Sequence, residues 1–115
     1  MHVYTDVTKG RTRYTEAANK DPAVIVLPEP DAGDYYHIDW IMWSFNPVTK
    51  HGIFKIFDST TNTLLTELRL GSDASSSFQL ISFNEKGFAG PTSSGLVFEL
   101  SSTDATAKTL TLQFR

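Results

Sequence analysis

The chain has 115 residues, no cysteine, 40% hydrophobic residues, and 10 Lys and Arg against 13 Asp and Glu. This length fits one domain, the absence of cysteine excludes disulfides and thiolate metal sites, and no apolar run reaches the roughly 18 residues that a membrane-spanning helix needs. The basic residues are too few and too scattered to predict nucleic-acid binding. Composition therefore predicts a soluble, single-domain, β-rich protein without a membrane span.

The first residues differ from the rest in charge. Residues 1–20 contain four basic and two acidic residues, a net charge of +2, and the remaining residues contain six basic and eleven acidic ones, a net charge of −5. Residues 1–22 show no sustained apolar periodicity, which predicts an extended arm. Such an arm suits an acidic partner, although a solvated segment without a partner is the alternative. The arm residues expected to make contacts are Lys9, Arg11, Arg13, Tyr14 and Lys20.

Short strands separated by turns are predicted along residues 23–115, which form the second part of the chain. No segment has the periodicity of an amphipathic helix. Seven to eight strands at regular spacing predict an all-β, antiparallel β-sandwich, either jelly-roll-like or Ig-like. Periodicity leaves the connectivity of these strands open. The predicted strands are 23–27, 35–45, 53–58, 64–70, 78–83, 96–100 and 110–114.

The most aromatic of these strands is residues 35–45. Its even positions form one apolar face, and Ile41, Trp43 and Phe45 form the other face toward the end of the segment. This pattern predicts a strand whose buried face switches midway, or a strand covered on both sides. Aromatic and β-branched enrichment, together with Pro47, favours a strand over a helix.

The two tryptophans are expected to differ in exposure. Trp40 lies within a dense apolar run and is expected in the core. Trp43 points to the opposite face and is expected at the surface, as a contact between subunits or as a platform for a sugar ring edged by Asp, Asn or Arg. The subunit contact is the favoured role. Phe45 and Phe88 are further candidates for an interface or a ligand contact.

Catalytic motifs are not found in the sequence. His37 and Asp39 are two residues apart on a strand and share a face, so they could serve as a base with an orienting carboxylate or as metal ligands. We expect them instead to belong to the solvated face of the strand. A phosphate-binding glycine motif, a nucleophile elbow and an activated serine are all missing. The sequence therefore predicts no catalytic residue, no cofactor and no metal site.

From residue 35 onward, the order of features resembles a family of small virion proteins of tailed bacteriophages. The residues that carry this likeness are His37-Ile38-Asp39, Ser44-Phe45-Asn46-Pro47 and the strand from Gly52 to Asp58. The strands at 64–70, 96–100 and 110–114 and the loop at 83–91 follow in the family's order. The chain departs from the family pattern in a less proline-rich loop at 84–94 and in its more aromatic 35–45 strand.

The resemblance implies a capsid decoration or cement protein that stabilises a phage head by binding across capsomers. Its partners would be the major capsid protein and copies of itself in a homotrimer, with no nucleic acid and no membrane. Its location would be the capsid surface of the virion, after synthesis in the host cytoplasm. The alternative is a carbohydrate- or receptor-binding β-sandwich module of a phage tail or surface protein, and a hydrolase that uses His37 and Asp39 is the third reading.

Overall fold

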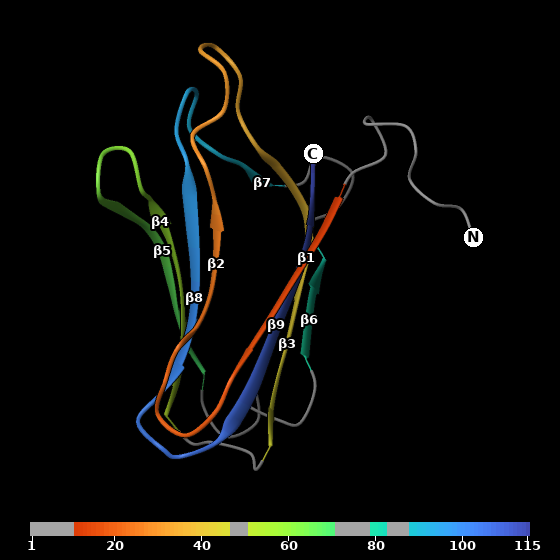
Figure 1. Ribbon diagram of the computed structural model, residues 1–115, viewed down its shortest axis with the longest axis vertical. Coiled ribbons are helices and arrows are strands. Elements are labelled where there is room, and N and C mark those ends of the chain that lie inside the picture. The colour runs from red at the N-terminus through yellow and green to blue at the C-terminus, as the bar shows by residue number, and fades with distance from the viewer. Residues whose placement is uncertain (1–10, 47–50, 71–78, 83–87) are drawn as a thin grey trace, which may run out of the picture.

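The computed structural model describes residues 11–46, 51–70, 79–82 and 88–115, which form two antiparallel sheets that face each other (Figure 1). Sheet A contains, in spatial order, β1 (Arg11–Ala17), β9 (Ala107–Phe114), β3 (His37–Asn46) and β6 (Gln79–Ser82), and the short β7 (Phe88–Ala89) also pairs with β3. Sheet B contains β2 (Ala23–Leu27), β8 (Leu96–Ser102), β4 (Gly52–Asp58) and β5 (Thr63–Leu70). The described part of the chain has no helix that is long and apolar enough to cross a membrane.

The strand pairs are nested along the chain. β1 pairs with β9, β2 with β8, β3 with β6, and β4 with β5, all in antiparallel fashion. From β1 to β4 the chain also changes sheet at every step (Figure 1). A long hairpin folded in this way into two sheets is a double-sheet jelly roll. The predicted all-β sandwich is therefore confirmed, and the connectivity that periodicity left open is that of a jelly roll.

Alternating side chains fill the space between the two sheets. In β2, Ala23, Ile25 and Leu27 are buried whereas the two valines between them are exposed. Strands β4, β8 and β9 show the same alternation over most of their lengths. Burial of each large apolar side chain stabilises the fold by about 1.5–3 kcal/mol. The period-two pattern seen in the sequence is thus the pattern that holds the sheets together.

Strand β3 changes its core-facing residues partway along its length. Ile38 is fully buried, and the register with β9 then shifts between Ile38 and Trp40. This β-bulge leaves Asp39 and Trp40 side by side on the outer side of the sheet. After the bulge, the buried residues are Ile41, Trp43 and Phe45. The predicted switch of the buried face is confirmed.

The two tryptophans lie on the opposite sides from those expected. Trp43 is 3% exposed and stacks on Phe54 of sheet B, with 5.6 Å between the ring centroids. Trp40 is half-buried on the outer face, where its indole Nε1 donates to Gln113. The bulge at residues 38–40 moves the later odd-numbered residues to the core side, so the expected exposure of Trp43 is wrong. Phe45 is likewise fully buried.

The segment predicted as an arm contains a strand of the sandwich. Residues 11–17 form β1, which pairs along its whole length with β9 at the edge of sheet A. An edge strand buries little, and within β1 only Thr15 and Ala17 are partly covered, so the apolar periodicity is weak. Residues 11–17 therefore belong to the sandwich and not to an extended arm. The rest of the arm up to residue 10, including Lys9, lies outside the described residues.

Candidate ligand-binding site

A pocket of about 340 Å³ opens at one end of the sandwich. Here the start of β1 and the end of β9 meet the loop between β2 and β3 (Figure 1). The pocket is lined by Arg11, Pro30, Asp34, Tyr35, Tyr36, Phe114 and Arg115. It thus combines aromatic rings with two guanidinium groups and a carboxylate. A second hollow of about 390 Å³, beside residues 16–18 and 107–109, has no aromatic ring in its lining.

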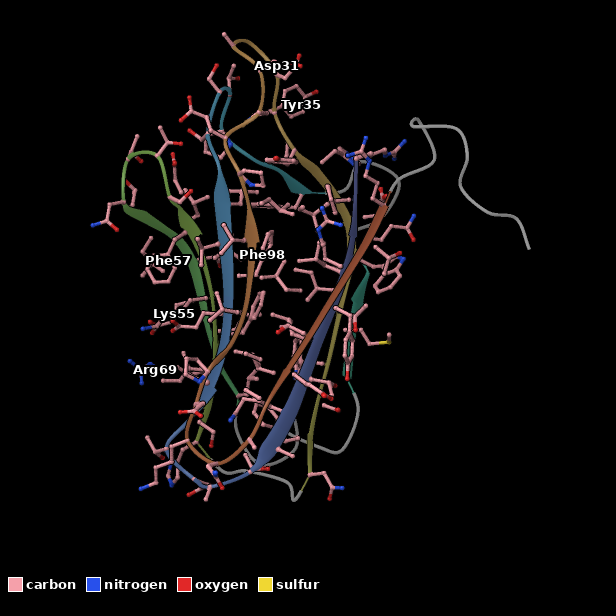
Figure 2. The ribbon with its side chains drawn as sticks, viewed as in Figure 1. Asp31, Tyr35, Lys55, Phe57, Arg69 and Phe98 are labelled. Carbon is pink, nitrogen blue, oxygen red and sulfur yellow. The ribbon has the colours of Figure 1, made fainter. Side chains whose placement is uncertain are left out.

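The loop that supplies the exposed aromatic ring is fixed by its own turn and by a neighbouring loop. The backbone N–H of Asp34 donates to the carbonyl of Asp31 at 2.9 Å, and Gly33 between them has a φ of 89°, as a type II turn requires. Ser93 ties this turn to the loop before β8, because its Oγ accepts from Gly33 N–H and its N–H donates to the Asp34 carbonyl. Tyr35 follows directly and is 53% exposed (Figure 2).

Tyr36 forms the inner wall of the pocket. Its hydroxyl donates to the carbonyl of Pro28, and its ring meets the ring of Phe114 edge-on, with 5.7 Å between centroids. The guanidinium of Arg13 lies 5.6 Å from the centroid of the same Phe114 ring. Burial raises the pKa of Tyr36, and the positive charges of Arg11 and Arg13 oppose that rise. The phenol therefore keeps its proton at neutral pH and acts as a donor.

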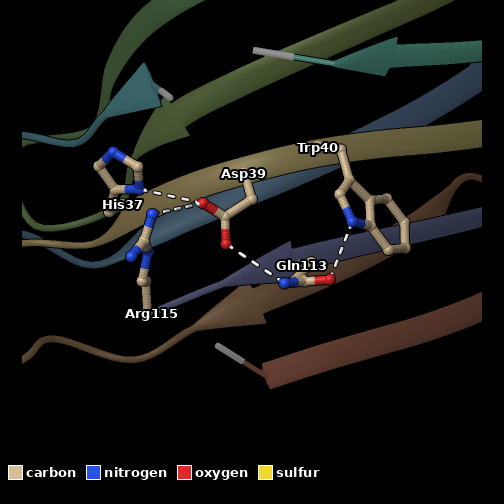
Figure 3. A network of polar contacts seen from close by, with 5 residues as sticks. All are labelled: His37, Asp39, Trp40, Gln113 and Arg115. Atoms are coloured by element: carbon tan, nitrogen blue, oxygen red, sulfur yellow. Dashed lines mark hydrogen bonds and ion pairs between the residues drawn. The ribbon is translucent and has the colours of Figure 1, made fainter. Parts of the chain in front are cut away.

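A polar network on the outer face of β3 and β9 holds the second guanidinium of the pocket (Figure 3). The Oδ1 atom of Asp39 accepts from Arg115 Nη2 at 3.1 Å and lies 3.3 Å from His37 Nδ1. The Oδ2 atom of Asp39 accepts from Gln113 Nε2 at 3.4 Å, and Gln113 Oε1 accepts from Trp40 Nε1 at 2.9 Å. The prediction that His37 and Asp39 share a face is confirmed. The carboxylate of Asp39 orients Arg115.

The structure brings only part of the predicted contact set together. Arg11 lines the pocket, and Arg13 lies beside it on Phe114. Tyr14 is exposed elsewhere on β1, where its hydroxyl donates to Glu16, and that hydrogen bond raises the pKa of Tyr14. Lys20 is exposed in the turn that follows β1, at the opposite end of this strand from Arg11. Phe88 of β7 is half-buried and packs against the core.

Several pocket residues were not predicted from the sequence. Asp34, Tyr35 and Tyr36 follow a turn-rich segment that contains Pro30 and Gly33, and an aromatic pair directly after such a turn is a signal that could have identified them. Arg115 carries no local signal, because its place in the pocket depends on the pairing of β9 with β1 and β3. Among the described residues, no group of three or more His, Asp and Glu side chains could hold a metal ion.

Comparison with known proteins gives no family for this chain. No family model matches it, and no curated protein matches it.

Similar folds occur among solved structures. The C-terminal CBM6 of LamC, a marine laminarinase from Zobellia galactanivorans, has a TM-score of 0.49 at 12% identity, over 90% of this chain and 98% of that one. A family 6 carbohydrate-binding module has a TM-score of 0.45 at 17% identity, over 85% and 67% of the two chains. The lectin domain of lectinolysin, solved with Lewis B antigen, has a TM-score of 0.45 at 11% identity, over 89% and 71%.

Proposed function

We propose that this chain is a non-catalytic β-sandwich module that binds a saccharide in the pocket at the start of β1 and the end of β9. The observation that carries the proposal is the exposed ring of Tyr35 beside the guanidinium groups of Arg11 and Arg115 in one open pocket. A sugar ring has apolar C–H faces that stack on aromatic rings and hydroxyl groups that bind charged and polar side chains. The lining of this pocket offers both kinds of contact.

The backbone that carries the Tyr35 ring is already fixed in the absence of a ligand. The turn at residues 31–34 is held by its own hydrogen bond and by two hydrogen bonds to Ser93. Tyr35 is therefore presented on a fixed backbone, so less conformational entropy is lost when a ligand stacks on its ring. Tyr36, packed against Phe114, supplies an apolar wall of the same pocket.

The polar contacts come from both sides of the pocket. Arg115 is held by Asp39, and its planar group of N–H donors is suited to two neighbouring oxygen atoms. Arg11 forms no ion pair with any residue that the structure describes, so its donors are available to a ligand. Asp34 adds an acceptor to the same pocket. Donors and an acceptor around an aromatic ring match the hydroxyl pattern of a sugar.

Replacing the exposed ring tests this proposal. We expect Tyr35→Ala to weaken saccharide binding about tenfold or more, because stacking and burial of an aromatic ring together exceed ~1.4 kcal/mol. A glycan array identifies the ligand, and titration calorimetry gives the affinities. Tyr14→Ala is the matched control, because Tyr14 is exposed to a similar extent but lies outside the pocket lining. Absence of any glycan signal from the intact chain would rule the proposal out.

A further inference from the structure

The outer face of sheet B carries a row of apolar side chains. By register, Val26 of β2 lies beside Val97 of β8, Val97 beside Phe57 of β4, and Phe57 beside Leu64 of β5. Val26 is 57% exposed and Leu64 is 47% exposed, and the two residues between them are half-buried. Figure 2 shows Phe57 pointing away from sheet A, whereas Phe98 points into the sandwich. A row of this kind across a whole sheet is suited to an interface.

The next row on the same face is charged. By register it contains Val24, Glu99, Lys55 and Glu67, from β2 to β5. Lys55 Nζ lies 3.9 Å from Glu67 Oε1, and the other oxygen of Glu67 pairs with Arg69 Nε at 3.2 Å. Glu99 forms no ion pair with the described residues. The face therefore presents a carboxylate that forms no ion pair, next to Lys55 in its own row and beside an apolar row.

We infer that this face binds a second copy of the chain, sheet against sheet, about a twofold axis that runs parallel to the strands between β8 and β4. This symmetry places β8 opposite β4 of the second copy and β2 opposite β5. Each row of side chains then faces the same row of the second copy. The apolar rows then meet, with Val97 on Phe57 and Val26 on Leu64. Two sheets packed in this way are the ordinary aligned sandwich contact.

The charges favour this axis over the other in-plane twofold axis. With the axis parallel to the strands, Glu99 of each copy faces Lys55 of the other copy, so two complementary contacts form. With an axis perpendicular to the strands and centred on the charged row, Glu99 would face Glu99 and Lys55 would face Lys55. Like charges at an interface are unfavourable. The charged row is thus self-complementary about the axis parallel to the strands and self-repelling about the perpendicular axis centred on it.

The area of the outer face of sheet B determines how strong the self-association is expected to be. Four short strands spaced about 4.8 Å apart cover less area than the ~800 Å² per partner of a standard interface. We therefore expect a dimer whose population depends on concentration, with a dissociation constant in the micromolar range or higher. Sedimentation equilibrium of the full chain over a range of concentrations measures this dissociation constant.

Charge reversal tests the geometry of the contact. We expect Glu99→Lys and Lys55→Glu each to weaken self-association about tenfold or more, because each variant creates two like-charge contacts. An equimolar mixture of the two variants should restore the dimer, since only the mixed pair brings opposite charges together at both contacts. Restoration also shows that both variants are folded. Val26→Asp changes the apolar row. It should abolish self-association when it is the only substitution, and it should also abolish association of the mixture when both charge-reversal variants carry it.

Glu16→Lys is the matched control, because it reverses a charge on β1 of the opposite sheet and should leave association unchanged. The inference is overturned if the intact chain is monomeric at all concentrations, if it forms a trimer, or if the mixture associates no better than its components. None of these outcomes bears on the proposed saccharide binding, which involves the pocket at one end of the sandwich and not the outer face of sheet B.

Discussion

Lys108 shows how one buried side chain joins two distant parts of the chain. It is 1% exposed, and its Nζ donates to the carbonyls of Asn19 at 3.0 Å, Asp21 at 2.7 Å and Thr106 at 3.0 Å. Burial lowers the pKa of Lys108, and the nearby charge of Asp21 opposes that decrease. A buried ammonium group is tolerated because three carbonyl oxygens replace its water. The same bonds fasten the β1–β2 turn to β9.

Removing this ammonium group should destabilise the whole sandwich. We expect Lys108→Met, which keeps the aliphatic stem, to lower the free energy of unfolding by about 3 kcal/mol, because it leaves buried carbonyls without donors. Urea denaturation followed by tryptophan fluorescence measures the change. Lys20→Met removes an exposed lysine from the same turn and should change the stability by less than about 0.5 kcal/mol. Equal effects of the two substitutions would contradict this role for Lys108.

At the scale of elements, the turn between β4 and β5 depends on one carboxylate. Asp58 Oδ1 accepts from the backbone N–H groups of Thr60 at 2.9 Å and Thr61 at 3.2 Å. Burial favours the protonated form of Asp58, but hydrogen bonds from the backbone and side chain of Thr61, from Ser94 and from Thr60 outweigh it and lower the pKa below 3.8. The ionised carboxylate therefore stabilises the turn.

Because the pKa of Asp58 is lowered, its contribution to stability should depend on pH. The contribution of Asp58 to stability is fully present above the pKa of the unfolded chain, and it is lost as the pH falls through the lower pKa of the folded chain. We expect Asp58→Asn to be less stable than the intact chain at pH 7, with the difference shrinking as the pH falls below about 4. Denaturation midpoints measured from pH 7 to pH 2 test this, and parallel curves for the two proteins would contradict it.

Elements with a local signal were predictable, whereas elements that depend on distant partners were not. Alternation within residues 23–27 and 110–114 is a property of neighbouring residues, so both strands were predicted and are seen in β2 and β9. β1 was not predicted, because its partner β9 lies at the other end of the chain and covers few of its side chains. A switch of the buried face within β3 was predicted, but the position of the bulge that causes it decides whether Trp40 or Trp43 is buried, and no local pattern fixes that position.

At the scale of the whole molecule, the pocket is a product of topology. The jelly roll brings residue 11, residues 34–36 and residues 114–115 to one end of the sandwich. These segments lie far from one another in the sequence, and their combined chemistry exists only after folding. The sequence-based candidates were therefore drawn to the aromatic strand at 35–45, most of whose later aromatic side chains are core residues.

The likeness to phage virion proteins, with its capsid partner, trimer and virion location, stays a prediction. The placement of β1 changes how the proposed arm can be studied. Removal of residues 1–22 would take away an edge strand and with it Arg11 and Arg13, so any loss of binding would not identify an arm. Removal of residues 1–10 alone keeps every strand that the structure describes.

The most direct test of saccharide binding is to locate the ligand on the intact chain. Backbone amide signals of the isotope-labelled protein are followed by NMR during titration with the saccharide that gives the strongest array signal. We expect the largest shifts at Tyr35, Tyr36, Arg11 and Arg115, around the pocket at the start of β1 and the end of β9. Shifts confined to the outer faces of the sheets, or no shift with any saccharide, would contradict the proposal.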